Sequence, residues 1–244
     1  MYSHTYDILK TVKKMYFKGG GSLRGVKKSL LFSLMFIILL LTACSESTEE
    51  TIYKHLEEAV SLEKEFEEQQ GSIMELEKEE QEIYDEIISL SMEDFDKIKE
   101  LAKKATDNID KRTELINIEN ESLEESEEEI IKIEDSIEKL ENNEVRKKAQ
   151  NMYDVMMERF NAYDELHKLY TDTLKLEKEL YVLFQEEETG QKELTDHISE
   201  LNNDYEQVIE ANKLFNKYTS EYNERKKDFY ESSNLNIDYD VKDE

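Results

Sequence analysis

The strongest constraint on the fold is a stripe of apolar residues in the middle of the chain. From Phe95 to Leu140, read in alternating steps of three and four, eleven of fourteen positions are apolar, where random placement would give about five. This spacing of about 3.5 residues keeps one face of an α-helix turned toward a core. It predicts a helix roughly 70 Å long at 1.5 Å per residue. Three polar exceptions fall together near its middle: Arg112, Glu119 and Ser126.

Three similar stripes accompany the first. They run from Ile52 to Leu90, from Val145 to Phe184 and from Leu194 to Phe229. The segments between the stripes contain residues that typically start or stop helices. These are a Ser47-x-x-Glu50 capping box, a turn with a new N-cap at Ser91 to Asp94, an entry at Asn142-Asn143 and a break at Thr189-Gly190.

Residues that break helices are almost absent. The chain has no proline, and only Gly71 and Gly190 follow residue 43. Four long helices with short links run alternately up and down and bury their stripes together. The sequence therefore predicts an all-α, elongated up-and-down four-helix bundle with coiled-coil-like packing over residues 51–231. The alternative is a three-helix, spectrin-like bundle in which the first two stripes fuse through Ser91. Residues 232–244 are polar and acidic, and we expect a mobile tail there.

The N-terminal part has the features of an export signal. Lys27 and Lys28 precede an apolar run from Leu30 to Leu41. This run is shorter than the about 20 residues that a membrane-spanning helix needs, but it is typical of the apolar region of a signal peptide. We assign residues 1–43 to a signal peptide. The stretch before Lys27 adds nothing to such a signal, and its three consecutive glycines indicate that translation starts later than Met1.

The sequence Leu41-Thr42-Ala43-Cys44 resembles a bacterial lipobox. Cleavage between Ala43 and Cys44 would make Cys44 the first residue of the mature protein, with a diacylglyceryl group on its sulfur and fatty acyl chains such as palmitate. Cys44 is the only cysteine, and no other side chain supplies a thiol. Each buried methylene contributes about 0.8 kcal/mol, and two chains give stable anchoring. We predict a lipidated linker over residues 44–50 and a location at the outer face of the cell membrane.

The charge of the mature chain limits its partners. Without residues 1–43 the chain keeps 25 basic and 59 acidic residues, a formal charge of −34. Such a field repels nucleic acid and anionic lipid headgroups. We expect no nucleic-acid partner, and contact with the membrane only through the lipid on Cys44.

Four segments of the mature chain resemble a known family. They are "YKHLEEAVSLEKEFEEQQ" (53–70), "EIYDEIISLSMEDFDKIKELAKKA" (82–105), "RFNAYDELHKLY" (159–170) and "YEQVIEANKLFNKYTSEYNERKKDFYES" (205–232). They resemble the YkyA family of cell-wall-binding lipoproteins of Gram-positive bacteria. The resemblance implies a helical up-and-down bundle outside the cytoplasmic membrane and an association with the cell wall, and it implies no reaction.

No pattern of residues points to catalysis, a metal or a cofactor. Acidic residues are so frequent that two of them occur at glycosidase spacing by chance. His55, His167 and His197 lack the spacing of metal ligands. The glutamate runs at 127–129 and 186–188 lack the carbonyl ligands and glycine of a calcium loop. We predict a protein without catalytic residues, metal or cofactor.

Tyrosine is the residue type best suited to binding a glycan or a protein here. Four tyrosines fall on the apolar stripes and are expected to pack in the core: Tyr163, Tyr170, Tyr205 and Tyr222. Tyr153, Tyr181 and Tyr230 flank the stripes and form the candidate binding surface.

These features together predict a non-enzymatic, lipid-anchored extracytoplasmic helical protein. Its expected partner is a cell-wall polymer or an envelope protein. Two alternatives are a peptidoglycan hydrolase or its activator, and an extracytoplasmic chaperone or transport accessory.

Overall fold

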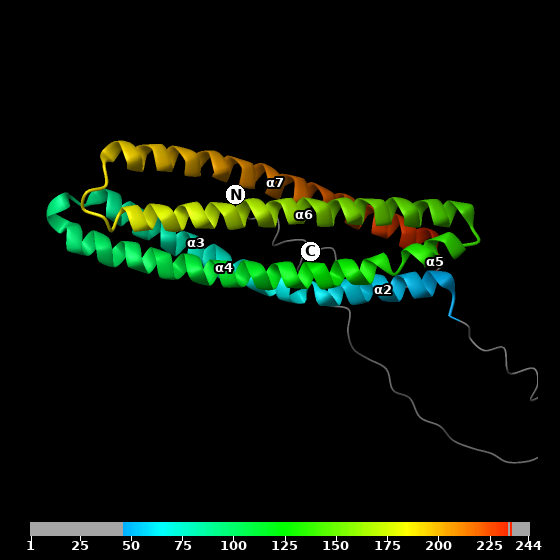
Figure 1. Ribbon diagram of the computed structural model, residues 1–244. Coiled ribbons are helices and arrows are strands. Elements are labelled where there is room, and N and C mark those ends of the chain that lie inside the picture. The colour runs from blue at the N-terminus through cyan, green and yellow to red at the C-terminus, as the bar shows by residue number, and fades with distance from the viewer. Residues whose placement is uncertain (1–45, 234, 236–244) are drawn as a thin grey trace, which may run out of the picture.

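The computed structural model describes residues 46–233 and 235, and these residues form helices and turns without any strand (Figure 1). The α-helices are α2 (Thr48–Leu62), α3 (Lys64–Ser89), α4 (Phe95–Ile131), α5 (Glu134–Lys139), α6 (Asn143–Leu183) and α7 (Gln191–Ser232). A 3₁₀ turn, η3 (Met92–Asp94), lies between α3 and α4. The predicted all-α class is confirmed.

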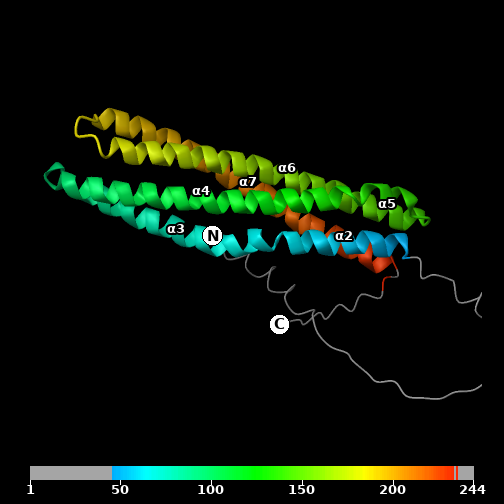
Figure 2. The same cartoon turned by 60° about the horizontal axis from the view of Figure 1, so that its bottom comes forward.

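The helices form four long arms. α2 and α3 make the first arm, α4 and α5 the second, α6 the third and α7 the fourth, and successive arms run in opposite directions (Figures 1 and 2). One end of the rod, the near end, holds Ser47, Asn142 and Ser232. The opposite far end holds the turns at Ser91 and Gly190. The predicted elongated up-and-down four-helix bundle is confirmed.

The three-helix alternative is wrong because the chain reverses direction at Ser91. The backbone of Ser91 is extended, with φ −102° and ψ 168°, and its side chain accepts a hydrogen bond from the Glu93 amide. The Asp94 carboxylate accepts a bond from the Ser91 amide at 3.4 Å. This capping box starts a new helix rather than continuing α3.

The caps expected at the near end are also present. The Ser47 hydroxyl accepts from the Glu50 amide at 3.1 Å, and the Glu50 carboxylate accepts from the Ser47 amide at 2.9 Å. Helix α2 therefore begins at Thr48, directly after the predicted N-cap Ser47. The side chain of Asn142 accepts from the amides of Glu144 and Val145 and starts α6.

The first arm contains a break that the sequence did not indicate. At Glu63 the backbone leaves helical geometry, with ψ 4°, and separates α2 from α3. Ser122 of α4 occupies the break. Its hydroxyl donates to the Leu62 carbonyl at 2.6 Å and accepts from the Phe66 amide at 3.2 Å. A side chain from the neighbouring arm thus replaces part of the lost backbone hydrogen bonding.

The second arm is broken as well. The stripe from Phe95 to Leu140 predicted a single helix, but α4 ends at Ile131 and α5 begins at Glu134. The apolar face continues across the interruption, since Ile130, Ile133 and Ile137 are all buried. The prediction of the buried face is confirmed, whereas the prediction of one continuous helix is wrong.

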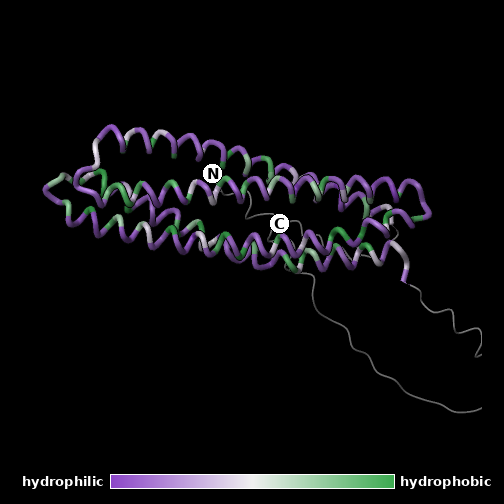
Figure 3. The backbone as a smooth tube through the Cα atoms, in the orientation of Figure 1, coloured by the Kyte–Doolittle hydropathy of each residue, from purple (hydrophilic) through white to green (hydrophobic). Residues whose placement is uncertain are grey.

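The core consists of three apolar clusters along the rod. The cluster at the near end includes Ile52, Met152 and Phe229, and the cluster toward the far end includes Ile87, Ile109 and Leu174. A smaller one between them contains Leu123, Ala162, Tyr163 and Phe215. Along each arm in Figure 3, apolar residues recur between polar ones, as amphipathic helices require.

Helix α7 packs chiefly along α6 (Figures 1 and 2). Its buried stripe places residues seven apart: Leu201, Val208, Phe215, Tyr222 and Phe229. Toward the far end, Leu194 and Ile198 were expected in the core but are only half-buried. The beginning of α7 is therefore covered on one side only, and the rod is more open there than at the near end.

Candidate functional site

The predicted lipidation site lies outside the described residues. Cys44 and Ala43 belong to the segment 1–45, and most of the predicted C-terminal tail, residues 234 and 236–244, is likewise outside. The first described helix has its N-cap at Ser47, three residues after Cys44 in the sequence. Any group attached to Cys44 is thus close in sequence to the near end of the rod.

The candidate tyrosine surface is largely wrong. The side chain of Tyr181 is fully buried, and its hydroxyl donates to Glu80 of α3. Tyr230 is 5% exposed, and its hydroxyl donates to Glu57 of α2 at 3.0 Å. Only Tyr153 is half-buried, and it packs against the near-end cluster. Both buried tyrosines stand beside stripe residues, and their rings reach across the bundle to a carboxylate on the first arm.

The tyrosines assigned to the stripes agree better with the prediction. Tyr163, Tyr170 and Tyr222 are buried, and Tyr205 is half-buried. The hydroxyl of Tyr170 donates to Glu77 at 2.8 Å. These side chains contribute to the core and leave little aromatic surface for a ligand.

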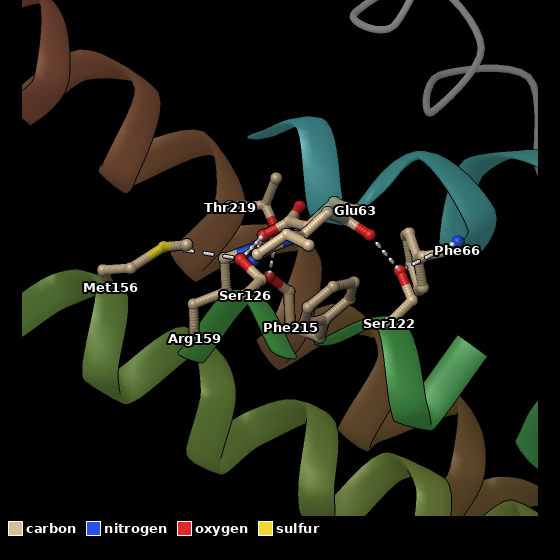
Figure 4. Close-up of polar contacts among 9 residues, drawn as sticks. Glu63, Phe66, Ser122, Ser126, Met156, Arg159, Phe215 and Thr219 are labelled. Atoms are coloured by element: carbon tan, nitrogen blue, oxygen red, sulfur yellow. Dashed lines mark hydrogen bonds and ion pairs between the residues drawn. The ribbon is translucent and has the colours of Figure 1, made fainter. Parts of the chain in front are cut away.

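A polar layer centred on Glu63 crosses all four arms (Figure 4). Two guanidinium nitrogens of Arg159, on α6, each donate to a Glu63 oxygen at 2.8 Å. Ser126 of α4 donates to Glu63 at 3.0 Å, and the Nε of Arg159 donates to Thr219 of α7 at 3.1 Å. The guanidinium also lies 4.9 Å from the centre of the Phe215 ring. Such a two-pronged, charge-assisted pair fixes the relative positions of the helices that carry it.

A second polar layer lies nearer the far end. Arg112 of α4 pairs with Glu177 of α6, and both side chains are almost completely buried. Burial raises the pKa of Glu177, and the attraction of Arg112 opposes this effect. Burial alone would lower the pKa of Arg112, but Glu177, Tyr170 and Glu80 raise it. The guanidinium is therefore permanently charged inside the core.

Glu119 makes a third polar contact between these layers. It is 2% exposed, and Gln70 of α3 donates to its carboxyl at 2.5 Å. Burial raises the pKa of Glu119 to about 8, while the hydrogen bond from Gln70 and the neighbouring hydroxyl of Tyr163 oppose the shift. Glu119 therefore holds a proton at neutral pH.

The three polar interruptions of the central stripe are thus the α4 members of three buried contacts. Ser126 contacts Glu63, Glu119 contacts Gln70, and Arg112 contacts Glu177. Each buried carboxyl is bonded to a donor on another arm. An arrangement of this kind sets the register of helices against each other, because a shifted helix would leave a buried polar group without its partner.

The histidines are held by ordinary contacts. His55 bonds to Glu129 at 2.5 Å across the first two arms, and His197 bonds to the Leu176 carbonyl at 2.8 Å. His167 is half-buried and stacks on the Tyr163 ring. Within the part of the chain that the structure describes, no three His, Cys, Asp or Glu side chains are arranged to hold a metal ion.

The outer surface has a shallow depression between α6 and α7, which we call the α6–α7 groove. Its volume is about 470 Å³. Its lining includes three apolar residues, which we call its floor, namely Leu169, Ala211 and Leu214, and three acidic residues, Glu165, Glu206 and Glu210. Asn203 and Gln207 complete the lining. Nothing in the sequence pattern marked this site, because its residues lie beside the apolar stripes rather than on them.

The described helices are not of the membrane-spanning kind. Between residues 46 and 233, none combines the length with the apolar character that crossing a bilayer demands.

Three known proteins or families are similar to this chain. A family model for YkyA, described as "Putative cell-wall binding lipoprotein", matches residues 47–232. The uncharacterized lipoprotein YkyA of Bacillus subtilis (strain 168) is 31% identical over 98 residues, which cover 40% of this chain and 44% of that protein. The match thus spans less than half the length of this relative.

A solved structure shares the fold. The crystal structure of a conserved protein of unknown function from Staphylococcus aureus superposes with a TM-score of 0.55 at 17% identity, covering 74% of this chain and 91% of that one. Because the family model extends over the entire helical rod, and the resemblance of the four sequence segments agrees with it, the chain belongs to the YkyA family of lipoproteins.

Proposed function

We propose that this chain is a non-enzymatic lipoprotein, anchored through Cys44 to the outer face of the cytoplasmic membrane. Its acidic rod would stand in the wall space and bind a wall polymer or an envelope protein there. The observation that carries the proposal is the position of the first helix cap. Ser47 starts the rod only three residues after Cys44, so a lipid on Cys44 would hold the near end at the bilayer.

The length of the rod supports a role away from the membrane. Helix α6 alone has 41 residues, which correspond to about 60 Å at 1.5 Å per residue. With the near end at the bilayer, the turns at Ser91 and Gly190 would be the parts farthest from it.

The placement of the acidic residues supports binding rather than catalysis. A hydrolase of wall glycan needs carboxyl groups in a cleft that admits the sugar. The carboxyls with the most strongly raised pKa values, Glu119 and Glu177, lie inside the bundle and are bonded to Gln70 and Arg112. They are suited to holding helices together, and both are almost completely buried.

The partner's chemistry follows from charge. Teichoic acids are polyanions, and a chain of formal charge −34 repels them over a Debye length of about 10 Å at 0.1 M salt. Stacking of a wall glycan on surface tyrosines is disfavoured, because Tyr181 and Tyr230 are buried. Two routes remain: divalent ions that bridge carboxylates to phosphates, and a protein partner with positive charge.

The anchor is tested by the substitution Cys44→Ser in cells supplied with a fatty-acid analogue. We expect labelling to be abolished and an uncleaved precursor to accumulate, because serine has no thiol to accept the lipid. Ser45→Ala is the matched control, and it should be labelled and processed normally. Equal labelling of the Cys44→Ser protein would refute the proposed anchor.

A further inference from the structure

The α6–α7 groove brings apolar and acidic residues of two helices together on the outer surface. Its floor is apolar, and 43% of the Leu214 side chain is exposed there. Glu165 on α6 and Glu206 on α7 line it, and neither forms an ion pair with any residue that the structure describes. Glu210, also in the lining, is paired with Lys213 at 2.6 Å. The groove therefore offers apolar contact area and two carboxylates without a cationic partner.

We propose that this groove is a docking site for a basic amphipathic helix of another protein. The inference rests on the proposed binding function and names its partner class. A helix laid along two packed helices presents residues at i, i+3, i+4 and i+7 to the groove. Apolar residues on that face would contact Leu169, Ala211 and Leu214, and flanking Lys or Arg residues would reach Glu165 and Glu206.

Charge complementarity selects this occupant over others. Phosphate-rich polymers, nucleic acids and anionic lipid headgroups are repelled by the carboxylates at the groove. A second copy of this chain has the same strongly negative formal charge, and self-association would bring like charges together. A neutral glycan could donate hydroxyl hydrogen bonds to these carboxylates, but it would leave their negative charge without a counter-charge. A cationic helix satisfies both the charge and the apolar floor.

The position of the groove is compatible with an extended partner. Glu165 lies 22 residues beyond the start of α6 at Asn143, or roughly 33 Å along the helix axis. A protein docked there would sit beside the middle of the rod, clear of the near end where the lipid is proposed to be attached.

The test measures binding of a fluorescent synthetic peptide to the mature lipoprotein in nanodiscs of phosphatidylcholine. The peptide has about 18 residues of Leu and Lys at amphipathic helical spacing, about five turns. A peptide of the same composition with a scrambled order is the second probe, and empty nanodiscs give the binding to lipid alone. We expect the amphipathic peptide to bind the protein more tightly than the scrambled one.

Two matched double variants locate the site. Glu165→Lys with Glu206→Lys should weaken peptide binding about tenfold, because each reversal replaces an attraction with a repulsion. The control, Glu121→Lys with Glu128→Lys, changes the net charge by the same amount at exposed positions of α4. It should weaken peptide binding less than about threefold. Leu214→Ser removes part of the floor without changing charge and should also weaken binding.

Three outcomes would overturn the proposal. Equal weakening by both double variants would show general attraction to an acidic surface. Equal binding of the amphipathic and scrambled peptides would exclude a helix in the groove. Self-association of the lipoprotein that Leu214→Ser abolishes would make a second copy the occupant. None of these results affects labelling at Cys44, so the proposed lipid anchor is tested independently of the docking site.

Discussion

Among the buried carboxyls, Glu119 has the least compensation, because Glu177 is paired with Arg112 whereas Glu119 has no cationic partner among the described residues. Its carboxyl accepts one hydrogen bond from Gln70, and no cation is among the groups that shift its pKa. Burying a carboxyl in this position costs less free energy when the group is neutral than when it is charged. The folded protein therefore retains a proton that the unfolded chain releases.

This difference makes the stability dependent on pH. The pKa of Glu119 is about 8 in the fold, compared with an ordinary value of 4.5. Between these values the unfolded chain loses the proton while the folded chain holds it, so the free energy of unfolding contributed by Glu119 falls as pH rises from 4.5 to 8. Glu119→Gln removes the ionisation and should raise the free energy of unfolding at pH 8 by on the order of 2–4 kcal/mol. Near pH 4.5 the gain should vanish.

Thermal or denaturant unfolding at several pH values measures this effect. Glu121→Gln, at an exposed position two residues away, is the matched control and should show no comparable trend. A gain from Glu119→Gln that is the same at pH 5 and pH 8 would contradict the assigned protonation.

The sequence located the polar residues of the core but could not pair them. Arg112, Glu119 and Ser126 stand out because they interrupt a regular stripe. Their partners, however, are 65, 49 and 63 residues away in the chain, and the period of one helix contains no information on which residue of another helix faces it. The same limit explains Tyr181 and Tyr230, whose burial depends on carboxylates of the first arm.

At the scale of elements, periodicity predicted the helices well because the two faces of each helix differ strongly. On α4 every stripe residue from Ile98 to Ile130 is buried, including the polar ones. The breaks at Glu63 and after Ile131 were missed because neither has a proline or glycine. At Glu63 the break depends on a tertiary contact with the hydroxyl of Ser122. No helix-breaking residue in the local sequence indicates such a contact.

Two adjacent isoleucines test the orientation of the second arm. Ile130 is fully buried, whereas Ile131 is 46% exposed. Ile130→Asp should lower the free energy of unfolding by about 4 kcal/mol, because it places a carboxylate in the near-end cluster. Ile131→Asp introduces the same side chain toward water and should cost less than about 1 kcal/mol.

Helix melting followed by circular dichroism on the mature protein compares the two variants. If Ile130→Asp melted like the wild type, or if the two substitutions cost the same, the buried face assigned to α4 would be wrong.

At the scale of the whole molecule, negative charge dominates the surface. Direct binding of a member of this family to the wall would have to overcome the repulsion between its carboxylates and the wall phosphates. Divalent cations bound between the two would supply the missing attraction. We therefore expect the mature protein to sediment with purified walls in millimolar Ca²⁺ or Mg²⁺ and to stay in solution with chelator.

Chelator and salt distinguish ion bridging from stacking of a glycan on tyrosine, the route that the burial of Tyr181 and Tyr230 disfavours. Bridged binding should weaken as monovalent salt competes for the carboxylates, whereas stacking on tyrosine would survive chelator and strengthen as salt screens the repulsion. Sedimentation that persists in chelator would contradict bridging. Absence of sedimentation in every condition would leave a protein, bound in the α6–α7 groove, as the partner.

The up-and-down order of the arms has a mechanical consequence. With the proposed lipid anchor near Ser47 and a partner held along α6, a pull between membrane and partner would be directed along the helix axes. Such a force shears neighbouring arms past each other and does not peel one arm away. The layers at Glu63 and Arg112 cross the direction of sliding, so they would have to rupture together with the apolar clusters beside them. We therefore expect a rod built in this way to withstand tension along its axis while its helices stay folded.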